Sequence, residues 1–260
     1  MASSNPTTEM PFLEHLEELR QRLFKVVAAL AVTVTIAFVL VVKFNAISWL
    51  AQPIQPYLGG RKLVFTHPGD SFSITMTVSL GMGVVLAAPV ILYQLWAFVS
   101  PALYQREKRI VIPVLFAASG LFALGAAAAF KLVLPFALEF LLGFQSSALE
   151  AMITARDYFD FAISLCLVMG AVFELPIVLT GLTALGIVTP QQLRGWRRQA
   201  LIGSMLGAAI ITPGDLITTT LMVMVPLYGL YEASIVSSAI VHRRLQRRGL
   251  EAAGDVEALA

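Results

Sequence analysis

The chain is organised as long uncharged apolar runs separated by short segments that carry most of its charges. A run of about 20 apolar residues forms a helix about 30 Å long, which matches the hydrocarbon core of a bilayer. The runs are continuous rather than alternating, which favours membrane helices over the strands of a β-barrel. The predicted spans are residues 26–42, 76–99, 110–130, 161–189, 199–212 and 216–231.

These runs predict an all-α polytopic membrane protein with six transmembrane helices. Residues 1–25 should form a polar tail and an amphipathic helix, residues 26–241 the transmembrane domain, and residues 242–260 a C-terminal tail. The fifth and sixth runs would form helices of only about 21 and 24 Å, shorter than the ~30 Å core, so the bilayer should be thin beside them. We expect no stable structure after Arg248.

Composition narrows the class of protein further. Hydrophobic residues make up 58% of the 260 residues and charged residues only 13%, whereas a soluble domain carries about 25% charged residues. So few charges cannot cover a water-exposed surface of this size. The sequence therefore argues against a soluble enzyme and against a nucleic-acid partner, and it makes the lipid bilayer the expected surroundings.

Basic residues are distributed unevenly between the two sides of the predicted membrane domain. Of the 18 Lys and Arg residues, the expected outer side holds only Lys43, Arg61, Lys62, Lys131 and Arg156. The others lie in the two terminal segments and in the short loops of the opposite side. Because short cytoplasmic loops are enriched in Lys and Arg, the sequence predicts a multi-pass protein of the cytoplasmic (inner) membrane with both termini in the cytoplasm.

The two longer loops, residues 43–75 and 131–157, lie on the predicted outer side. Both contain apolar and aromatic residues, so we expect short helices at the membrane interface there. The run Thr189-Pro-Gln-Gln is typical of a capped helix start, and Thr154-Ala-Arg-Asp is a weaker version before the fourth span.

Glu174 is the only ionisable residue deep within a predicted span. A charge at that depth costs at least about 2.5 kcal/mol, so the side chain should face the bundle interior or a wet cavity. Pro176 frees a backbone group nearby. We favour a functional intramembrane polar site, and the alternative is a carboxyl that hydrogen-bonds a neighbouring helix for packing.

Two acidic positions lie among basic residues on the predicted cytoplasmic side. Glu18 belongs to an amphipathic helix over residues 12–23, where a solvated face with a Glu18–Arg22 pair is the simpler interpretation. Glu107 lies in the loop of residues 96–109, where local charge balance is the simpler interpretation. Periodicity and spacing alone favour these interpretations over a binding site.

Enzyme motifs are scarce. The three histidines, His15, His67 and His242, lie outside the predicted spans, and the sequence has no zinc-protease motif or phosphate-binding loop. His15 and Glu18 could both touch a metal, but two ligands make a poor site. We therefore expect no enzymatic activity, no cofactor and no metal.

Four segments together resemble the TatC family, the multi-span subunit of the twin-arginine protein translocase. They are residues 12–23, residues 96–109, residues 173–176 (Phe-Glu-Leu-Pro) and residues 212–215 (Thr-Pro-Gly-Asp). The resemblance implies the receptor and core subunit of a Sec-independent translocase. Such a subunit binds the twin-arginine signal peptides of folded cargo, acts with single-span TatA and TatB subunits in a larger self-associated complex, and exports folded proteins using the proton-motive force.

The resemblance also implies roles for particular residues. By motif match, Glu18 and Glu107 would engage the two arginines of the signal peptide. Arg20, Gln94 and Phe98 would help to shape the same cytoplasmic patch. Other positions that match functionally sensitive family positions are Pro53, Glu174 and Asp215.

The sequence departs from the TatC family pattern at one position, and three alternative functions remain. Some relatives have an Asp where this chain has Thr154, although Asp157 is close by. A proton-coupled secondary transporter of a small solute also fits six spans and a buried acid. A membrane-assembly factor without a peptide site and a membrane enzyme are weaker alternatives. Gly203 and Gly207 could support self-association, but we prefer packing between the fifth and sixth spans.

Overall fold

The computed structural model describes residues 10–99, 108–143, 152–211 and 218–258. Within these ranges the chain is helical, and the extended backbone that pairs is limited to one isolated parallel bridge between Val64 and Thr154. The prediction of an all-α polytopic membrane protein is confirmed.

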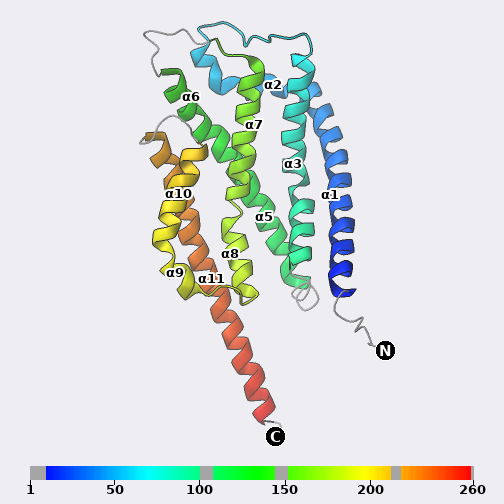
Figure 1. The fold of residues 1–260 in the computed structure, drawn as a ribbon, viewed down its shortest axis with the longest axis vertical. Coiled ribbons are helices and arrows are strands. Elements are labelled where there is room, and N and C mark those ends of the chain that lie inside the picture. The colour runs from blue at the N-terminus through cyan, green and yellow to red at the C-terminus, as the bar shows by residue number, and fades with distance from the viewer. Residues whose placement is uncertain (1–9, 100–107, 144–151, 212–217, 259–260) are drawn as a thin grey trace, which may run out of the picture.

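The described helices pack side by side with their long axes roughly aligned (Figure 1). Helix α1 contacts α3, α3 contacts α5 and α7, α5 contacts α7, and α11 contacts α8 and α10. Their bounds are α1 Met10–Lys43, α2 Ala46–Leu50, η1 Gln52–Tyr57, α3 Asp70–Val99, α5 Lys108–Ala128, the π-helix η2 Ala129–Val133, α6 Leu134–Gly143, α7 Ala155–Val172, α8 Leu175–Ala184, α9 Pro190–Gly195, α10 Arg197–Ile211 and α11 Thr218–Ala258.

Five helical segments in the described part of the chain are long and apolar enough to cross a membrane. They are Glu14–Lys43, Asp70–Phe98, Ile112–Gly143, Ala155–Ala184 and Thr220–Gln246. Helix α10 has 15 residues and is therefore about 22 Å long. The fifth predicted span is thus short, as expected, and the six-span count stays a prediction. The sixth was expected to be short as well, and this expectation is wrong.

Helices α1 and α11 are continuous beyond the boundaries that the apolar runs suggest. Helix α1 begins at Met10, so the amphipathic segment and the first span form one rod. Helix α11 has 41 residues and continues to Ala258, which corrects the expectation of no structure after Arg248. Its C-terminal part projects beyond the bundle, at the same end as the start of α1 (Figure 1). We call this end the near end and the opposite end the far end.

The far end is closed by short helices from the loops, as the sequence predicted. Helices α2 and η1 follow α1, and α6 extends the third span. The Tyr158 hydroxyl donates a hydrogen bond of 2.6 Å to the Leu50 carbonyl, which fastens α2 to α7. The buried Asp70 carboxylate accepts hydrogen bonds of 2.9 Å from the backbone N–H groups of Thr66 and His67. The loop between α1 and α3 is therefore fixed by hydrogen bonds.

Both predicted helix caps are present. Thr189 forms a capping box with Gln192 at the start of α9, and the Thr154 side chain accepts a hydrogen bond from the Asp157 N–H at the start of α7. These contacts satisfy backbone donors that a helix start otherwise leaves unpaired.

Glycines allow close helix contacts at a few points in the bundle. A Cβ atom added at Gly83 would collide with Val34 of α1, and one added at Gly181 would overlap the Trp96 indole of α3. On α10, Gly203 has open space around it, and Gly207 lies only within ordinary contact distance of Leu227. The closest glycine contacts therefore join α3 to α1 and to α8, not α10 to α11.

We expect Gly181→Ala to lower the free energy of unfolding by about 1–3 kcal/mol, because the added methyl group must displace the Trp96 ring. Gly203→Ala is the matched control, because its added methyl group meets nothing and gains helix propensity. Thermal unfolding of both purified variants in detergent measures the difference. Equal stability of the two variants would contradict the packing assigned to Gly181.

Candidate functional site

A polar cluster joins α1 to α3 at the near end of the bundle. The Arg22 guanidinium donates a hydrogen bond of 2.9 Å from Nε to Oε1 of Glu18, one turn earlier on α1. It also donates a bond of 3.3 Å from Nη1 to the Gln94 side-chain oxygen on α3. Gln94 is buried, whereas the Glu18 side chain is about one-third exposed. Arg22 thus links the partly exposed Glu18 carboxylate to the buried Gln94 amide and holds the carboxylate in place.

An aromatic contact lies beside this polar cluster. The His15 ring of α1 stacks on the Phe98 ring of α3, with centroids 4.3 Å apart and planes 9° from parallel. His15 Nδ1 lies 3.6 Å from Oε2 of Glu18. Stacking of this kind adds about 0.5–1.5 kcal/mol to the packing of two aromatic side chains. It gives the two helices a second contact at the same level.

Three of the five residues predicted to form the peptide-binding patch therefore lie together, namely Glu18, Gln94 and Phe98. Arg20 is on another face of α1, where its Nη2 pairs with Oε1 of Glu17 at 2.8 Å and both side chains are largely exposed. Glu107 lies outside the described residues.

Sequence reasoning missed the roles of Arg22 and His15. The spacing of Glu18 and Arg22 indicated their pairing, but one helix alone cannot reveal that Arg22 also reaches across to Gln94. His15 was considered only as a poor metal ligand. Its partner Phe98 is distant in sequence, so no local pattern could have identified the stacking.

The cluster leaves one carboxylate oxygen available. Arg22 donates from both Nε and Nη2 to Oε1 of Glu18, whereas Oε2 contacts only His15 Nδ1 among the described residues, at 3.6 Å. A guanidinium binds best through two parallel N–H donors to the two oxygens of one carboxylate. An external cation can therefore bind Oε2 directly, and it must displace Arg22 to bind both oxygens.

The intramembrane acid lies where the fourth span breaks. Glu174 separates α7 from α8 and precedes Pro176 in the first turn of α8. Its side chain is 6% exposed, and neither carboxylate oxygen has a hydrogen-bond partner among the described residues. The expectation that it faces the bundle interior is confirmed, and the alternative of a carboxyl hydrogen-bonded to a neighbouring helix is wrong for this part of the chain.

Two further candidate positions are Pro53 and Asp215. Pro53 is in the first turn of η1, at the far end of the bundle, and is half-buried. Asp215 lies outside the described residues. Pro53 is therefore not part of the near-end cluster.

A second polar cluster, which the sequence did not predict, joins α10 to α11. The Arg197 guanidinium donates a hydrogen bond of 2.7 Å to Glu232, and the Tyr228 hydroxyl donates one of 2.9 Å to the other oxygen of the same carboxylate. The bond to Glu232 raises the pKa of Arg197 above its ordinary value, so the guanidinium remains charged. The pair fastens the short α10 to the longer α11.

Comparison with known proteins places this architecture among protein translocases. The family described as Sec-independent protein translocase protein (TatC) matches residues 14–226. The TatC protein of Desulforapulum autotrophicum is 38% identical over 251 residues, which cover 96% of this chain and 92% of the relative. The TatC protein of Aquifex aeolicus is 38% identical over 237 residues, which cover 90% and 97% of the two chains.

A solved structure agrees with these relatives. The crystal structure described as the twin arginine translocase receptor TatC superposes with a TM-score of 0.72 at 38% identity, and the match covers 87% of this chain and 99% of that chain. These matches do not favour the alternative of a small-solute transporter. The extent of the match in sequence and in structure shows that this chain belongs to the TatC family of Sec-independent protein translocase proteins.

Proposed function

We propose that this protein is the receptor and core subunit of a twin-arginine translocase, and that it binds the signal peptides of folded cargo at the near end. The observation that carries the proposal is the meeting of Glu18, Gln94 and Phe98 between α1 and α3. Glu18 and Phe98 come from two separate motifs of the chain, and Gln94 lies just before the second motif. Their convergence on one partly exposed carboxylate supports a site for an incoming cation.

The chemistry of the site favours arginine over lysine. Two adjacent arginine side chains diverge, so one carboxylate cannot serve both well, and a second acid is needed. In the proposal Glu18 binds one guanidinium through Oε2, and Glu107 supplies the carboxylate for the other. A lysine ammonium is a compact charge without the planar fork that fits a carboxylate. Arg20, on another face of α1, helps to repel other cationic peptides.

The protein has a defined orientation in the membrane and partner subunits in this proposal. The near end lies in the cytoplasm, with both termini there, and the membrane is the cytoplasmic (inner) one, as the distribution of Lys and Arg predicts. The protein works as a receptor without a chemical step of its own, in a complex with single-span TatA and TatB subunits. The proton-motive force drives export. Glu174 offers a polar group in mid-membrane to a partner helix or to the signal peptide, and Pro53 and Asp215 are further functional positions.

A crosslinking experiment tests the peptide site. We expect a twin-Arg signal peptide to crosslink to the purified protein, and a twin-Lys version to crosslink weakly. Glu18→Gln and Glu107→Gln should each lower the affinity for the peptide by about 10-fold or more, because each removes a hydrogen bond to a charged group. The double variant should lose binding and export.

Glu17→Gln is the control for this experiment, because Glu17 is an exposed acid on the same turn of α1 and, within the described chain, pairs only with groups on that helix. Its binding should match that of the unaltered protein. Normal peptide binding by both single variants and by the double variant would rule out the proposed site.

A substitution at Glu174 should change stability and export in opposite directions. Glu174→Leu removes a buried carboxyl that has no hydrogen-bond partner in the described chain, so we expect it to raise the free energy of unfolding by about 1–3 kcal/mol. Export should fail, because the leucine cannot offer the polar group that the proposal assigns to this position. Thermal unfolding and a twin-arginine export reporter measure the two effects.

Glu139→Leu is the comparison for Glu174→Leu, because Glu139 is an exposed acid on α6. It should leave both stability and export nearly unchanged. A loss of stability in Glu174→Leu would show instead that the carboxyl supports the fold.

A further inference from the structure

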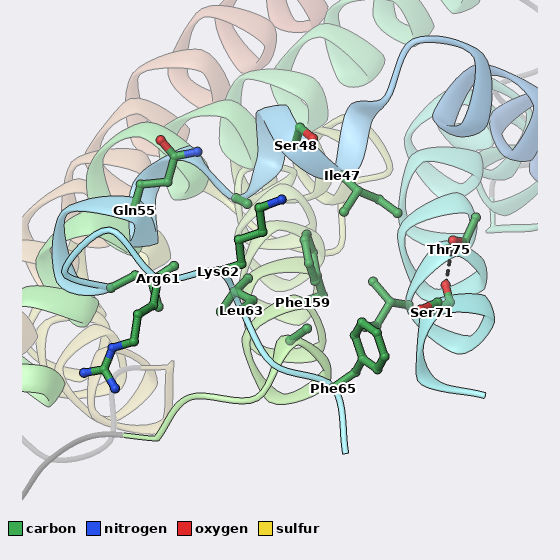
Figure 2. Close-up of a pocket in the computed structure, with 14 residues that line it drawn as sticks. Ile47, Ser48, Gln55, Arg61, Lys62, Leu63, Phe65, Ser71, Thr75 and Phe159 are labelled. Atoms are coloured by element: carbon green, nitrogen blue, oxygen red, sulfur yellow. Dashed lines mark hydrogen bonds between the residues drawn. The ribbon is translucent and has the colours of Figure 1, made fainter. Parts of the chain in front are cut away.

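A cavity of about 470 Å³ opens at the far end of the bundle. It lies between the loop helices α2 and η1 on one side and the first turns of α3 and α7 on the other (Figure 2). Because these turns are the ends of membrane spans, the cavity lies at the level where the hydrocarbon core meets the headgroups. It is separate from the near-end cluster of Glu18 and Arg22.

The lining of the cavity is amphipathic. Its apolar surface comes from Ile47, Ala51, Leu58, Leu63, Phe65, Ile74, Ala155 and Phe159. Neutral polar groups are supplied by Ser48, Gln55, Ser71 and Thr75. The two remaining lining residues, Arg61 and Lys62, are cationic, and none of the 14 lining residues is acidic.

The positive charge of Lys62 is not balanced by Asp70. Asp70 precedes the lining residue Ser71, but its carboxylate is buried, bonded to the loop backbone, and 3.9 Å from the Arg156 guanidinium. In Figure 2 the Lys62 side chain extends toward Ser48, whereas the Arg61 guanidinium points away from Phe159. Lys62 has no hydrogen bond or ion pair with the described residues, so its ammonium can serve a ligand.

The walls of the cavity are held in place without a ligand. Ile54 of η1 is fully buried, and the Tyr158 hydroxyl bonds to the Leu50 carbonyl at the end of α2. The loop beside Lys62 is bound to α7, because the Ala155 N–H donates a hydrogen bond of 2.7 Å to the Val64 carbonyl. A preformed cavity lowers the entropic cost of binding.

We propose that this cavity binds one anionic phospholipid from the surrounding leaflet. The apolar wall around Phe159 covers part of an acyl chain, and the phosphate lies at the rim beside Lys62, with Arg61 adding to the local positive charge. An anionic amphiphile matches both halves of this lining, and phospholipids are the amphiphiles that meet the protein at this depth. The bound lipid would fill the space between the loop helices and the spans.

Native mass spectrometry of the delipidated full-length protein tests the proposal. We expect phosphatidylglycerol to bind with one preferred site and phosphatidylcholine to bind much more weakly. Lys62→Gln should lower the affinity for phosphatidylglycerol by about 5-fold, and the double variant R61Q/K62Q by roughly 30-fold, as expected for the loss of one and two cations near a lipid phosphate.

Two further variants make the test specific. Lys43→Gln combined with Lys131→Gln removes the same charge from residues that do not line the cavity, so it should leave the preferred site intact. Ser48→Trp keeps both cations but occupies part of the cavity, so it should also weaken phosphatidylglycerol binding.

The proposal is overturned if R61Q/K62Q and the Lys43/Lys131 control lose affinity equally, or if phosphatidylcholine binds as tightly as phosphatidylglycerol. It is also overturned if glycerol phosphate, which has the headgroup charge but no acyl chain, competes as effectively as the lipid. Loss of folding in R61Q/K62Q would be detected by its thermal unfolding, and Ser48→Trp would then decide the outcome.

Discussion

Hydrocarbon offers no hydrogen-bond partners, and this constraint governs where every polar group of the protein lies. The backbone satisfies it by remaining helical through each span. Hydroxyl groups within the spans satisfy it locally, since Ser79, Ser119 and Thr183 each donate to the carbonyl four residues earlier. Charged groups pair where water is near, as Glu18 does with Arg22 and Glu232 with Arg197. The protein therefore has polar clusters toward the ends of its spans and an almost neutral interior.

Glu174 is the exception within the described chain, and the helix breaks at the same place. Three other prolines, Pro89, Pro113 and Pro226, lie inside helices that continue past them. At Pro176 the span instead divides into α7 and α8, and the Glu174 carbonyl accepts hydrogen bonds from the N–H groups of Ile177 and Val178. The backbone is thus satisfied at the break, whereas the carboxyl is not. An unpartnered acid at such a break costs stability, which supports the functional role proposed for Glu174.

The sequence predicts those features that depend on neighbours along the chain. Continuous apolar runs located the long spans, and the Thr189 and Thr154 patterns located two helix starts, because hydropathy and capping are local. Contacts between helices were not predictable in this way. The bond from Arg22 to Gln94 and the stacking of His15 on Phe98 depend on the register of α1 against α3. The length of α11 was misjudged because its polar C-terminal part continues the helix without an apolar face to signal it.

The geometry of the near-end cluster depends on close contacts inside the membrane. Gly83 lets α3 approach α1 at Val34, which sets the separation of the helices that carry Glu18 and Gln94. Gly181 lets α8 touch Trp96, two residues from both Gln94 and Phe98. Helix α8 begins directly after Glu174 and carries Gly181. The break after Glu174 and the near-end cluster are therefore connected through the close packing of α8 against α3.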